Sequence, residues 1–339
     1  MNSTQRFNAE EQTGDKWICQ VMAAEGVIGV LGNILVCFVI LRVKFLHNMT
    51  NYLLVNLAVA DMLLCFQSFF FYSTSSPCCT LIAYLPESFA VRILFCRLIV
   101  SEYLAWALFY ASAYNVCVVT FERFAAIVHP LQFARQLTAT RMKTMIALIW
   151  VMSFLFSLPF LFINKASNDP DKACTRIKYP DQAFPIVLTV TLFLFGYLLP
   201  ITLMSLAYYK MQVTLKRQAN ALKLQHARAA AYDLVIARQR LVTMLMIVLG
   251  ALIILWTPGY TALLLCLHPT DNSSLPFCHS KTFEYIHGIF DFAFYFNSVI
   301  NPFIYEFKYK KFRKGLKVVF CSCFKRHGNN RVDIGIVPL

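Results

Sequence analysis

Residues 52–75, YLLVNLAVADMLLCFQSFFFYSTS, decide the fold because they form a long apolar stretch with one acid, Asp61, near its middle. The stretch has the roughly 20 residues that an α-helix needs to cross the hydrocarbon core of a bilayer. Six more stretches share this character, and together the seven predicted spans are residues 20–42, 52–75, 97–121, 143–163, 184–208, 241–266 and 283–305. We therefore expect an all-α membrane protein, a bundle of seven transmembrane helices.

Composition supports a membrane protein. Hydrophobic residues make up 58% of the 339 residues and charged residues only 14%, whereas soluble domains have about 45–50% and about 25%. The net charge is +14, and the basic residues cluster after the first, third, fifth and seventh predicted spans. Because such residues stay in the cytoplasm during insertion, we expect a multi-pass plasma-membrane protein with an extracellular N-terminus and a cytoplasmic C-terminus. The basic excess therefore reflects topology and predicts no nucleic-acid partner.

The chain divides into an extracellular tail (1–19), the membrane domain (20–305) and a cytoplasmic segment (306–339). The inner connection 209–240 has no Gly or Pro and is rich in helix formers, so it is expected to continue the fifth and sixth helices. After residue 305, apolar residues recur at helical spacing among cations, which predicts a short amphipathic eighth helix on the cytoplasmic membrane surface. A disordered basic tail is the alternative. Cys321 and Cys323 follow this segment, placed either for palmitoylation or as free thiols.

Polar residues inside the spans carry the functional signal, because a charge at the bilayer centre costs about 2.5–3.5 kcal/mol on insertion scales. They belong to a pattern with one motif per helix, in order, that resembles the rhodopsin-like (class A) G-protein-coupled receptors: Gly32-Asn33, Asn56-Leu57-Ala58-Val59-Ala60-Asp61, Glu122-Arg123-Phe124, Trp150, Pro200 with Tyr208, Trp256-Thr257-Pro258 and Asn301-Pro302-Phe303-Ile304-Tyr305. The resemblance implies a receptor that binds an extracellular ligand and activates a heterotrimeric G protein.

The resemblance implies a coupling switch at the inner end of the bundle. Arg123 is expected to be held by Glu122 at rest and released to the G protein, with Phe124, Tyr208 and Tyr305 as further members of this switch. The alternative role for Arg123 is a positive anchor at the membrane edge. Arg238 stands where some family members carry an acid that pairs with this arginine. The salt bridge between that acid and Arg123, which would hold the third and sixth helices together, is therefore expected to be missing. Its absence would raise basal signalling.

A mid-membrane polar network is the second implied site. Asp61 and Ser112 offer the oxygen ligands that a hard cation prefers, and the full set is Asn33, Asp61, Ser112, Asn297, Ser298 and Asn301. The resemblance implies an allosteric sodium ion here, and no other cofactor is expected. A hydrated polar network that only packs the helices is the alternative.

Prolines in the later spans predict hinges, because proline removes a backbone hydrogen bond and kinks its helix. The activation hinge consists of Pro200, Trp256, Pro258 and Pro302. In the family, Trp256 relays ligand binding to the hinge. Its packing departs from the usual pattern, since Leu252 replaces a common aromatic and Ala113 a larger aliphatic residue.

The resemblance implies a disulfide between Cys96 and Cys174 that ties the third helix to the second outer loop. Cys96 lies 27 residues before Arg123, further than is usual, so the third helix is expected to begin differently. Cys266 and Cys278 are candidates for a second, short loop, and Cys19 is a candidate partner for Cys78 or Cys79; spacing alone leaves the connectivity of these five cysteines open. Glycosylation is expected at Asn2 and Asn272.

The ligand class is narrowed by exclusion. Residues 283–305 contain no lysine for a retinal Schiff base, and the third helix lacks the aspartate of amine receptors at the level of its aromatic residues. The expected pocket combines aromatic and charged side chains, namely Glu102, Tyr103, Trp106, His287, Asp291 and Tyr295. Mixed charge over a broad opening favours a peptide, and residues 50–57 and 124–131 are most similar to the neuropeptide branch. Amine, lipid and nucleoside ligands stay open as alternatives.

Other functional classes have weaker support in the sequence. A transporter built from repeats would show paired broken helices, and an enzyme would show a clustered set of catalytic or metal-binding residues; neither pattern is visible. The chain is therefore expected not to be an enzyme. After Phe320 the tail has one hydroxyl residue, Ser322, so we expect only weak arrestin recruitment by the tail.

Overall fold

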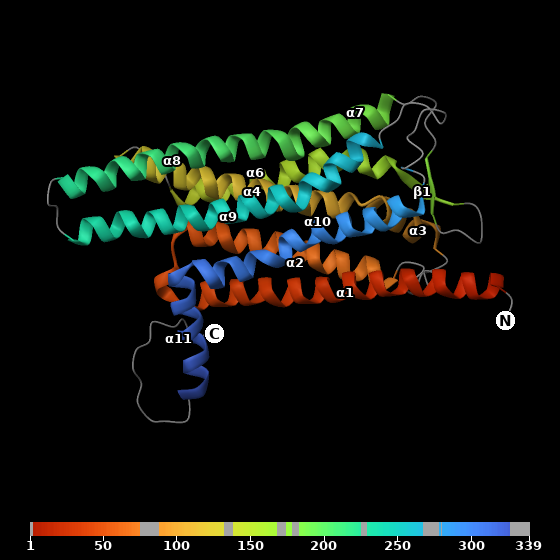
Figure 1. Cartoon of the computed structure of the whole chain (residues 1–339), viewed down its shortest axis with the longest axis horizontal. Coiled ribbons are helices and arrows are strands. Elements are labelled where there is room, and N and C mark those ends of the chain that lie inside the picture. Colours follow the sequence, from red (N-terminus) through yellow and green to blue (C-terminus); the bar gives the residue numbers. More distant parts are fainter. Residues whose placement is uncertain are drawn as a thin grey trace.

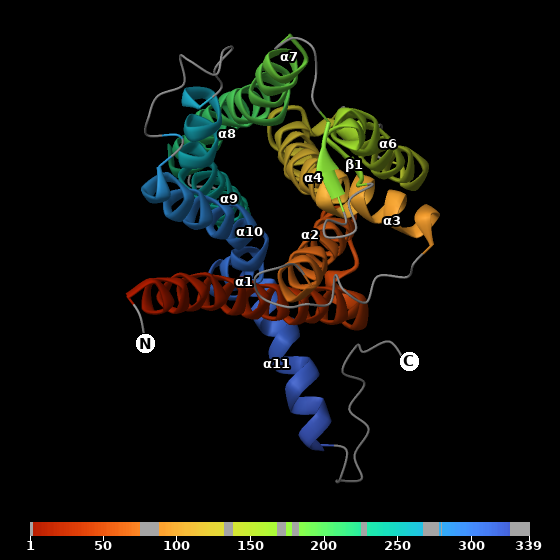
Figure 2. The same cartoon turned by 90° about the vertical axis from the view of Figure 1, so that its right-hand side faces the viewer.

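The computed structural model of the chain describes residues 3–74, 88–131, 138–167, 174–177, 183–224, 229–266, 278 and 280–325. The long helices run roughly parallel (Figure 1) and surround a common centre when viewed along the bundle (Figure 2). They are α1 (Ser3–Arg42), α2 (Met49–Thr74), α4 (Tyr103–Val128), α6 (Ala139–Ser157), α8 (Leu199–Leu224), α9 (Ala229–Leu265) and α10 (Lys281–Lys308). The expected all-α bundle is confirmed.

Six segments are long and apolar enough to cross a membrane by length and composition: Ile18–Arg42, Met49–Ser73, Phe89–Val128, Ala139–Phe162, Ile186–Lys223 and Ala231–Leu265. The seventh long helix, α10, has 28 residues and so is also long enough, at about 1.5 Å per residue. Its apolar run is interrupted by polar residues, including His287, Asp291 and Asn297. Its polarity belongs to the functional sites described below.

The third membrane segment is not one regular helix. It begins as α3 (Phe89–Phe95), widens into the π-helical turn η3 (Cys96–Val100), and continues as α4 only after Glu102. Glu102 has φ 60°, the left-handed conformation that residues other than glycine rarely adopt. Ser101 holds this break, because its hydroxyl donates to the Cys96 carbonyl and accepts from the Asn164 backbone N–H. The break explains the long separation of Cys96 from Arg123.

The fifth membrane segment is also interrupted. It consists of α7 (Ala183–Thr191), the π-helical turn η5 (Leu192–Leu198) and α8, which has Pro200 near its start. Proline cannot donate a backbone hydrogen bond to the preceding turn, and a π-helical turn is one way for a helix to accommodate the gap. At the inner end, α8 reaches Leu224 and α9 begins at Ala229, so the predicted continuation of both helices is confirmed.

The end of the bundle that carries the short strands lies opposite the end that carries α11 (Figure 1). After the 3-10 turn η4 (Leu158–Phe162), strands β1 (Asn164–Ala166) and β2 (Cys174–Arg176) pair antiparallel, with Ala166 opposite Cys174. A disulfide joins Cys96 to Cys174, and another joins Cys266 to Cys278. Cys19 is also in a disulfide, and its two candidate partners lie outside the described residues.

The amphipathic helix α11 (Lys310–Lys325) leaves the bundle at a steep angle to the long helices (Figure 1). It begins later than residue 306, because α10 continues to Lys308. Phe312 and Val319 are buried on its apolar face. The Tyr309 hydroxyl donates to Asn51 Oδ1 at 3.1 Å, and burial raises its pKa, which favours the protonated donor form. This bond ties the start of α11 to the 3-10 turn η1 (Lys44–Leu46) and α2.

Candidate functional site: a polar relay through a helical bundle

Asp61 lies at the centre of the bundle and is fully buried. Its Oδ1 accepts hydrogen bonds from the Ser112 hydroxyl at 2.6 Å and the Ser298 hydroxyl at 2.8 Å. Its Oδ2 accepts from the Asn301 side-chain amide at 2.8 Å. Asn33 joins the group by donating to the Ser298 carbonyl at 3.1 Å. The network therefore links α1, α2, α4 and α10 through side chains that the sequence singled out.

Some oxygen atoms of the same network accept no hydrogen bond from the described residues. The side-chain oxygens of Asn33, Asn297 and Asn301 are buried and have no hydrogen-bond partner within the described part of the chain. Carboxylate, hydroxyl and amide oxygens are the ligands that hard cations prefer. The residues present therefore fit a sodium ion held by Asp61 and Ser112, although Asn297 makes no described bond to Asp61. A bound sodium ion would supply positive charge next to the Asp61 carboxylate.

At the inner end of α4, Arg123 and Glu122 form a bidentate pair. Arg123 Nε donates to Glu122 Oε2 at 2.6 Å and Arg123 Nη2 to Glu122 Oε1 at 2.9 Å. The Thr50 hydroxyl of α2 lies 3.1 Å from both carboxylate oxygens. Paired charged hydrogen bonds of this kind are stronger than neutral ones. The arginine is thus held by its neighbour, and the sequence did not identify Thr50 as part of this contact.

The other predicted switch residues lie near this pair but not in one cluster. The Tyr208 hydroxyl of α8 is 2.7 Å from the Thr120 hydroxyl, and Phe124 packs edge-on against His129. The Tyr305 hydroxyl is buried without a described partner, while its ring packs against Phe312 of α11. The two tyrosines therefore reach the inner half from two different helices, α8 and α10.

A cavity of about 290 Å³ opens beside Arg123 at the inner end of the bundle. Its lining combines two arginines with apolar residues: Arg123, Ala126, Ile127, Pro130, Arg238 and Leu241. Arg238 therefore lines the same cavity as Arg123, at the position where some family members carry an acid. No acid of the described chain holds Arg238 there by a salt bridge. The two helices α4 and α9 are not locked together by charge at this point.

The hinge tryptophan, Trp256, lies two residues before Pro258, is buried and packs in an aromatic cluster. Its ring centroid is 4.0 Å from that of Phe109 and 6.0 Å from that of Phe294, and these two rings stack on each other at 4.2 Å. The sequence drew attention to the altered positions Leu252 and Ala113, and both are buried. It missed Phe109 and Phe294, which are the aromatic partners of the tryptophan.

The outer mouth gathers most of the predicted pocket residues. Trp106 Nε1 donates to Glu102 Oε2 at 3.1 Å. The Trp106 ring stacks on Phe160 and makes a tilted contact with Phe294. On α10, His287 Nδ1 is 3.3 Å from Asp291 Oδ2. Tyr103 is different, because its hydroxyl donates to the Phe154 carbonyl of α6 at 3.5 Å.

Tyr295 is buried below the mouth. Its hydroxyl donates to Gln67 Oε1 of α2 at 3.5 Å, and its ring packs edge-on against Tyr72. Trp106 and Tyr295 both pack against Phe294, which in turn contacts Trp256. The outer mouth is therefore connected to the hinge tryptophan by continuous aromatic packing.

Glu25 is an acid that the sequence reasoning missed. It lies in α1, inside the span predicted at residues 20–42, and only 5% of it is exposed. Neither carboxylate oxygen has a hydrogen-bond partner among the described residues. The signal that would have found it is the one applied to Asp61, a carboxylate inside an apolar span.

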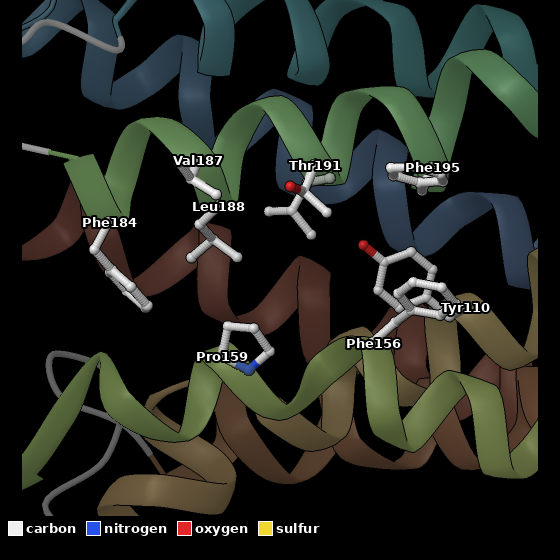
Figure 3. Close-up of a pocket in the computed structure, with 9 residues that line it drawn as sticks. Tyr110, Phe156, Pro159, Phe184, Val187, Leu188, Thr191 and Phe195 are labelled. Carbon is white, nitrogen blue, oxygen red and sulfur yellow. The ribbon is translucent and has the colours of Figure 1, made fainter.

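A separate groove lies on the outer surface between α6 with η4 and α7 with η5 (Figure 3). It has a volume of about 110 Å³ and is apolar except for the hydroxyls of Tyr110 and Thr191. Val187 and Phe195 on its rim are exposed apolar side chains, as expected of a face that meets lipid. None of the predicted ligand residues lines this groove, so the outer mouth is the better candidate ligand site.

Several predicted modification sites cannot be placed. Asn2 and Asn272 lie outside the described residues, and the side chains of Cys321 and Cys323, at the end of α11, are also outside them. Glycosylation and palmitoylation therefore stay predictions.

Comparison with known proteins agrees with this geometry. Residues 32–305 match the family described as 7 transmembrane receptor (rhodopsin family). The chain belongs to this family, and it is accordingly a multi-pass membrane receptor that signals through G proteins, not an enzyme.

Several relatives in that family are receptors named after peptides. The chain is 31% identical to the neuromedin-U receptor 2 of Rattus norvegicus over 322 residues, which cover 90% of this chain and 75% of the relative. It is 27% identical to the somatostatin receptor type 1 of Rattus norvegicus, covering 94% and 76%. It is 28% identical to the substance-P receptor of the same species, covering 88% and 69%.

Proposed function

We propose that this receptor binds an extracellular peptide, with its N-terminus and the β1–β2 end of the bundle outside the plasma membrane. The observation that carries the proposal is the outer mouth, where Glu102, His287 and Asp291 stand above an aromatic floor that leads to Trp256. Charged groups at the rim and aromatic rings below suit a peptide with both polar and apolar side chains. Relatives named for neuropeptides support the same class.

Signal transfer then follows the buried contacts. Peptide pressure on Trp106 and Phe294 shifts the packing around Trp256, and Pro258 and Pro302 let α9 and α10 bend. The Asp61 network lies between this hinge and the inner end, where a sodium ion would favour the resting arrangement. Movement of α9 away from α4 opens the cavity beside Arg123 to the G protein. Pro200, beside the π-helical turn η5, is a third point of bending.

The inner surface completes the proposed coupling site. Arg123 leaves Glu122 and contacts the G protein, with Tyr208 and Tyr305 supporting the open arrangement. The basic and apolar faces of α11 lie on the membrane surface, where Cys321 and Cys323 are sites for lipid attachment. Recruitment of arrestin through the tail is expected to be weak.

The decisive experiment separates a peptide from the amine, lipid and nucleoside alternatives. Tissue extract from the source organism is applied to cells that express the receptor, before and after digestion of the extract with a broad-specificity protease. G-protein activation that digestion abolishes supports a peptide ligand. Activation that survives digestion, or partitions into an organic lipid phase, contradicts it. Cells expressing Arg123→Ala at matched surface level are the control for a receptor-borne signal.

A further inference from the structure

Three carboxylates face the outer half of the bundle from different helices. Glu25 comes from α1, Glu102 from the start of α4 and Asp291 from α10. Trp106, which donates to Glu102, packs against Phe294, and Phe294 packs against Tyr295, one turn after Asp291 on α10. Gly26, next to Glu25, packs on Phe69, one turn before Tyr72 on α2. The rings of Tyr72 and Tyr295 meet edge to face. The acids therefore share one region of the outer bundle, together with the two tyrosines.

The two tyrosines form part of the wall of this region. Their ring centroids are 6.2 Å apart and their planes are perpendicular, so one ring presents its edge to the other. The Tyr295 hydroxyl donates to Gln67 Oε1 at 3.5 Å. Aromatic faces attract cations by about 0.5–2 kcal/mol, more when water is excluded. The wall thus adds to the attraction of the carboxylates for positive charge.

The negative charge of this region is not balanced within the described chain. Among the described residues, the base in contact with these acids is His287, whose Nδ1 is 3.3 Å from Asp291 Oδ2. Even a protonated His287 leaves an excess of carboxylates over cations. Like charges close together repel, and the repulsion grows as water is excluded.

Glu25 adds an independent observation. It is more than nine-tenths buried and has no hydrogen-bond partner among the described side chains. An isolated buried carboxylate costs several kcal/mol unless it is paired or takes up a proton. The adjacent residues Gly26 and Gly29 pack tightly on α2, so α1 cannot turn this side chain away without rearrangement. The structure therefore holds an acid without a counter-charge beside the tyrosine wall.

We propose that Glu25, Glu102 and Asp291, with Tyr72 and Tyr295, form a subsite for a cationic group of the ligand, a guanidinium or primary amine. Asp291 and Glu102 meet the cation at the accessible mouth, and Glu25 stabilises it from below, through the tyrosine wall. This inference rests on the proposed function and narrows it from a peptide to a basic peptide.

The test uses two small probes with an acetylated α-amine, arginine amide and citrulline amide, which therefore differ only in the charge of the side chain. The thermal unfolding midpoint of the purified full-length receptor is measured with each probe at the same millimolar concentrations. We expect arginine amide to raise the midpoint more than citrulline amide. The difference should disappear in Asp291→Asn and shrink in Glu25→Gln. Asp233→Asn, an exposed carboxyl on α9 at the inner end, is the matched control and should keep the full difference.

Equal effects of the two probes on the wild-type receptor would overturn the subsite. So would a difference that both Asp291→Asn and Glu25→Gln preserve. If Glu25→Gln fails to fold, the test rests on Asp291→Asn and Tyr72→Phe as separate variants. Glu25→Asp, which keeps the charge, is then the variant measured at position 25. These outcomes need no agonist, so they are independent of whether a protease-sensitive ligand is found.

A peptide agonist from the extract experiment gives a second readout. Replacing its arginines or lysines one at a time by citrulline or acetyl-lysine should lower potency at least tenfold at one position. The same replacement should have little further effect on Asp291→Asn receptors. A peptide that is active without any cationic group would overturn the inference while leaving the proposed function intact.

Discussion

Asp61 and Glu25 are both carboxylates buried in the same bundle, yet their surroundings differ completely. Asp61 receives three hydrogen bonds, from Ser112, Ser298 and Asn301. Glu25 receives none from the described residues. The centre of the bundle therefore satisfies its acid with hydrogen bonds, whereas the acid of the outer half has no partner among the described residues. A satisfied acid stabilises the resting receptor, whereas an unsatisfied one favours whatever brings a positive charge.

Removal of the satisfied acid should have the largest effect. Asp61→Leu leaves three buried donors without an acceptor, so the free energy of unfolding should fall by about 3 kcal/mol or more. Thermal unfolding of purified receptor and its surface expression both report this loss. Asp61→Asn, which keeps one acceptor oxygen, should lose clearly less. An unchanged unfolding midpoint in Asp61→Leu would show that the network does not support the fold.

Sodium should act on only one of the two acids. Replacing choline by sodium should stabilise the wild-type receptor by roughly 1–3 kcal/mol, at concentrations about ten to a hundred times the dissociation constant. The effect should vanish in Asp61→Asn and persist in Glu25→Gln. Persistence of the sodium effect in Asp61→Asn would place the ion elsewhere.

The unsatisfied acid should respond in the opposite direction. Glu25→Leu removes a buried carboxyl that has no described partner, so the ligand-free receptor should be stabilised by about 1 kcal/mol. Unfolding midpoints of Glu25→Leu and Asp61→Leu, measured side by side, give the comparison directly. Destabilisation of Glu25→Leu as large as that of Asp61→Leu would mean that Glu25 is satisfied in the resting protein.

A third buried acid, Glu122, should lie between these extremes. It pairs with Arg123 and also accepts from Thr50. Thr50→Ala removes one bond worth about 1 kcal/mol, which should weaken the hold on Arg123 and raise basal G-protein activation by up to about fivefold. Thr50→Ser keeps the hydroxyl and serves as the control. Equal basal activity of the two variants would remove Thr50 from the switch.

The sequence predicted the inner half better than the outer half. Asp61, Asn301 and Arg123 are visible as polar residues in apolar spans, and their order along the chain matches the family pattern. Breaks within a helix, by contrast, depend on its backbone hydrogen bonds, and the spacing of apolar residues in the sequence does not reveal these bonds. The π-helical turns η3 and η5 and the left-handed Glu102 therefore appeared only in three dimensions.

Side-chain direction limited the prediction of the ligand site. Tyr103 was expected in the pocket, whereas its hydroxyl donates to the Phe154 carbonyl of α6. Phe109 and Phe294, the partners of Trp256, look like ordinary core residues in a sequence with 31 phenylalanines. Glu25 could have been found, since a carboxylate in a span needs an explanation wherever it occurs.

The measurement that tests the central claim most directly is G-protein activation without ligand in cells that express the wild-type receptor or Arg123→Ala at matched surface levels. The missing acid at Arg238 predicts basal activity in the wild type, and Arg123→Ala should abolish it. Activity of the wild type that Arg123→Ala leaves unchanged would contradict the account of a receptor that couples through the cavity beside this arginine.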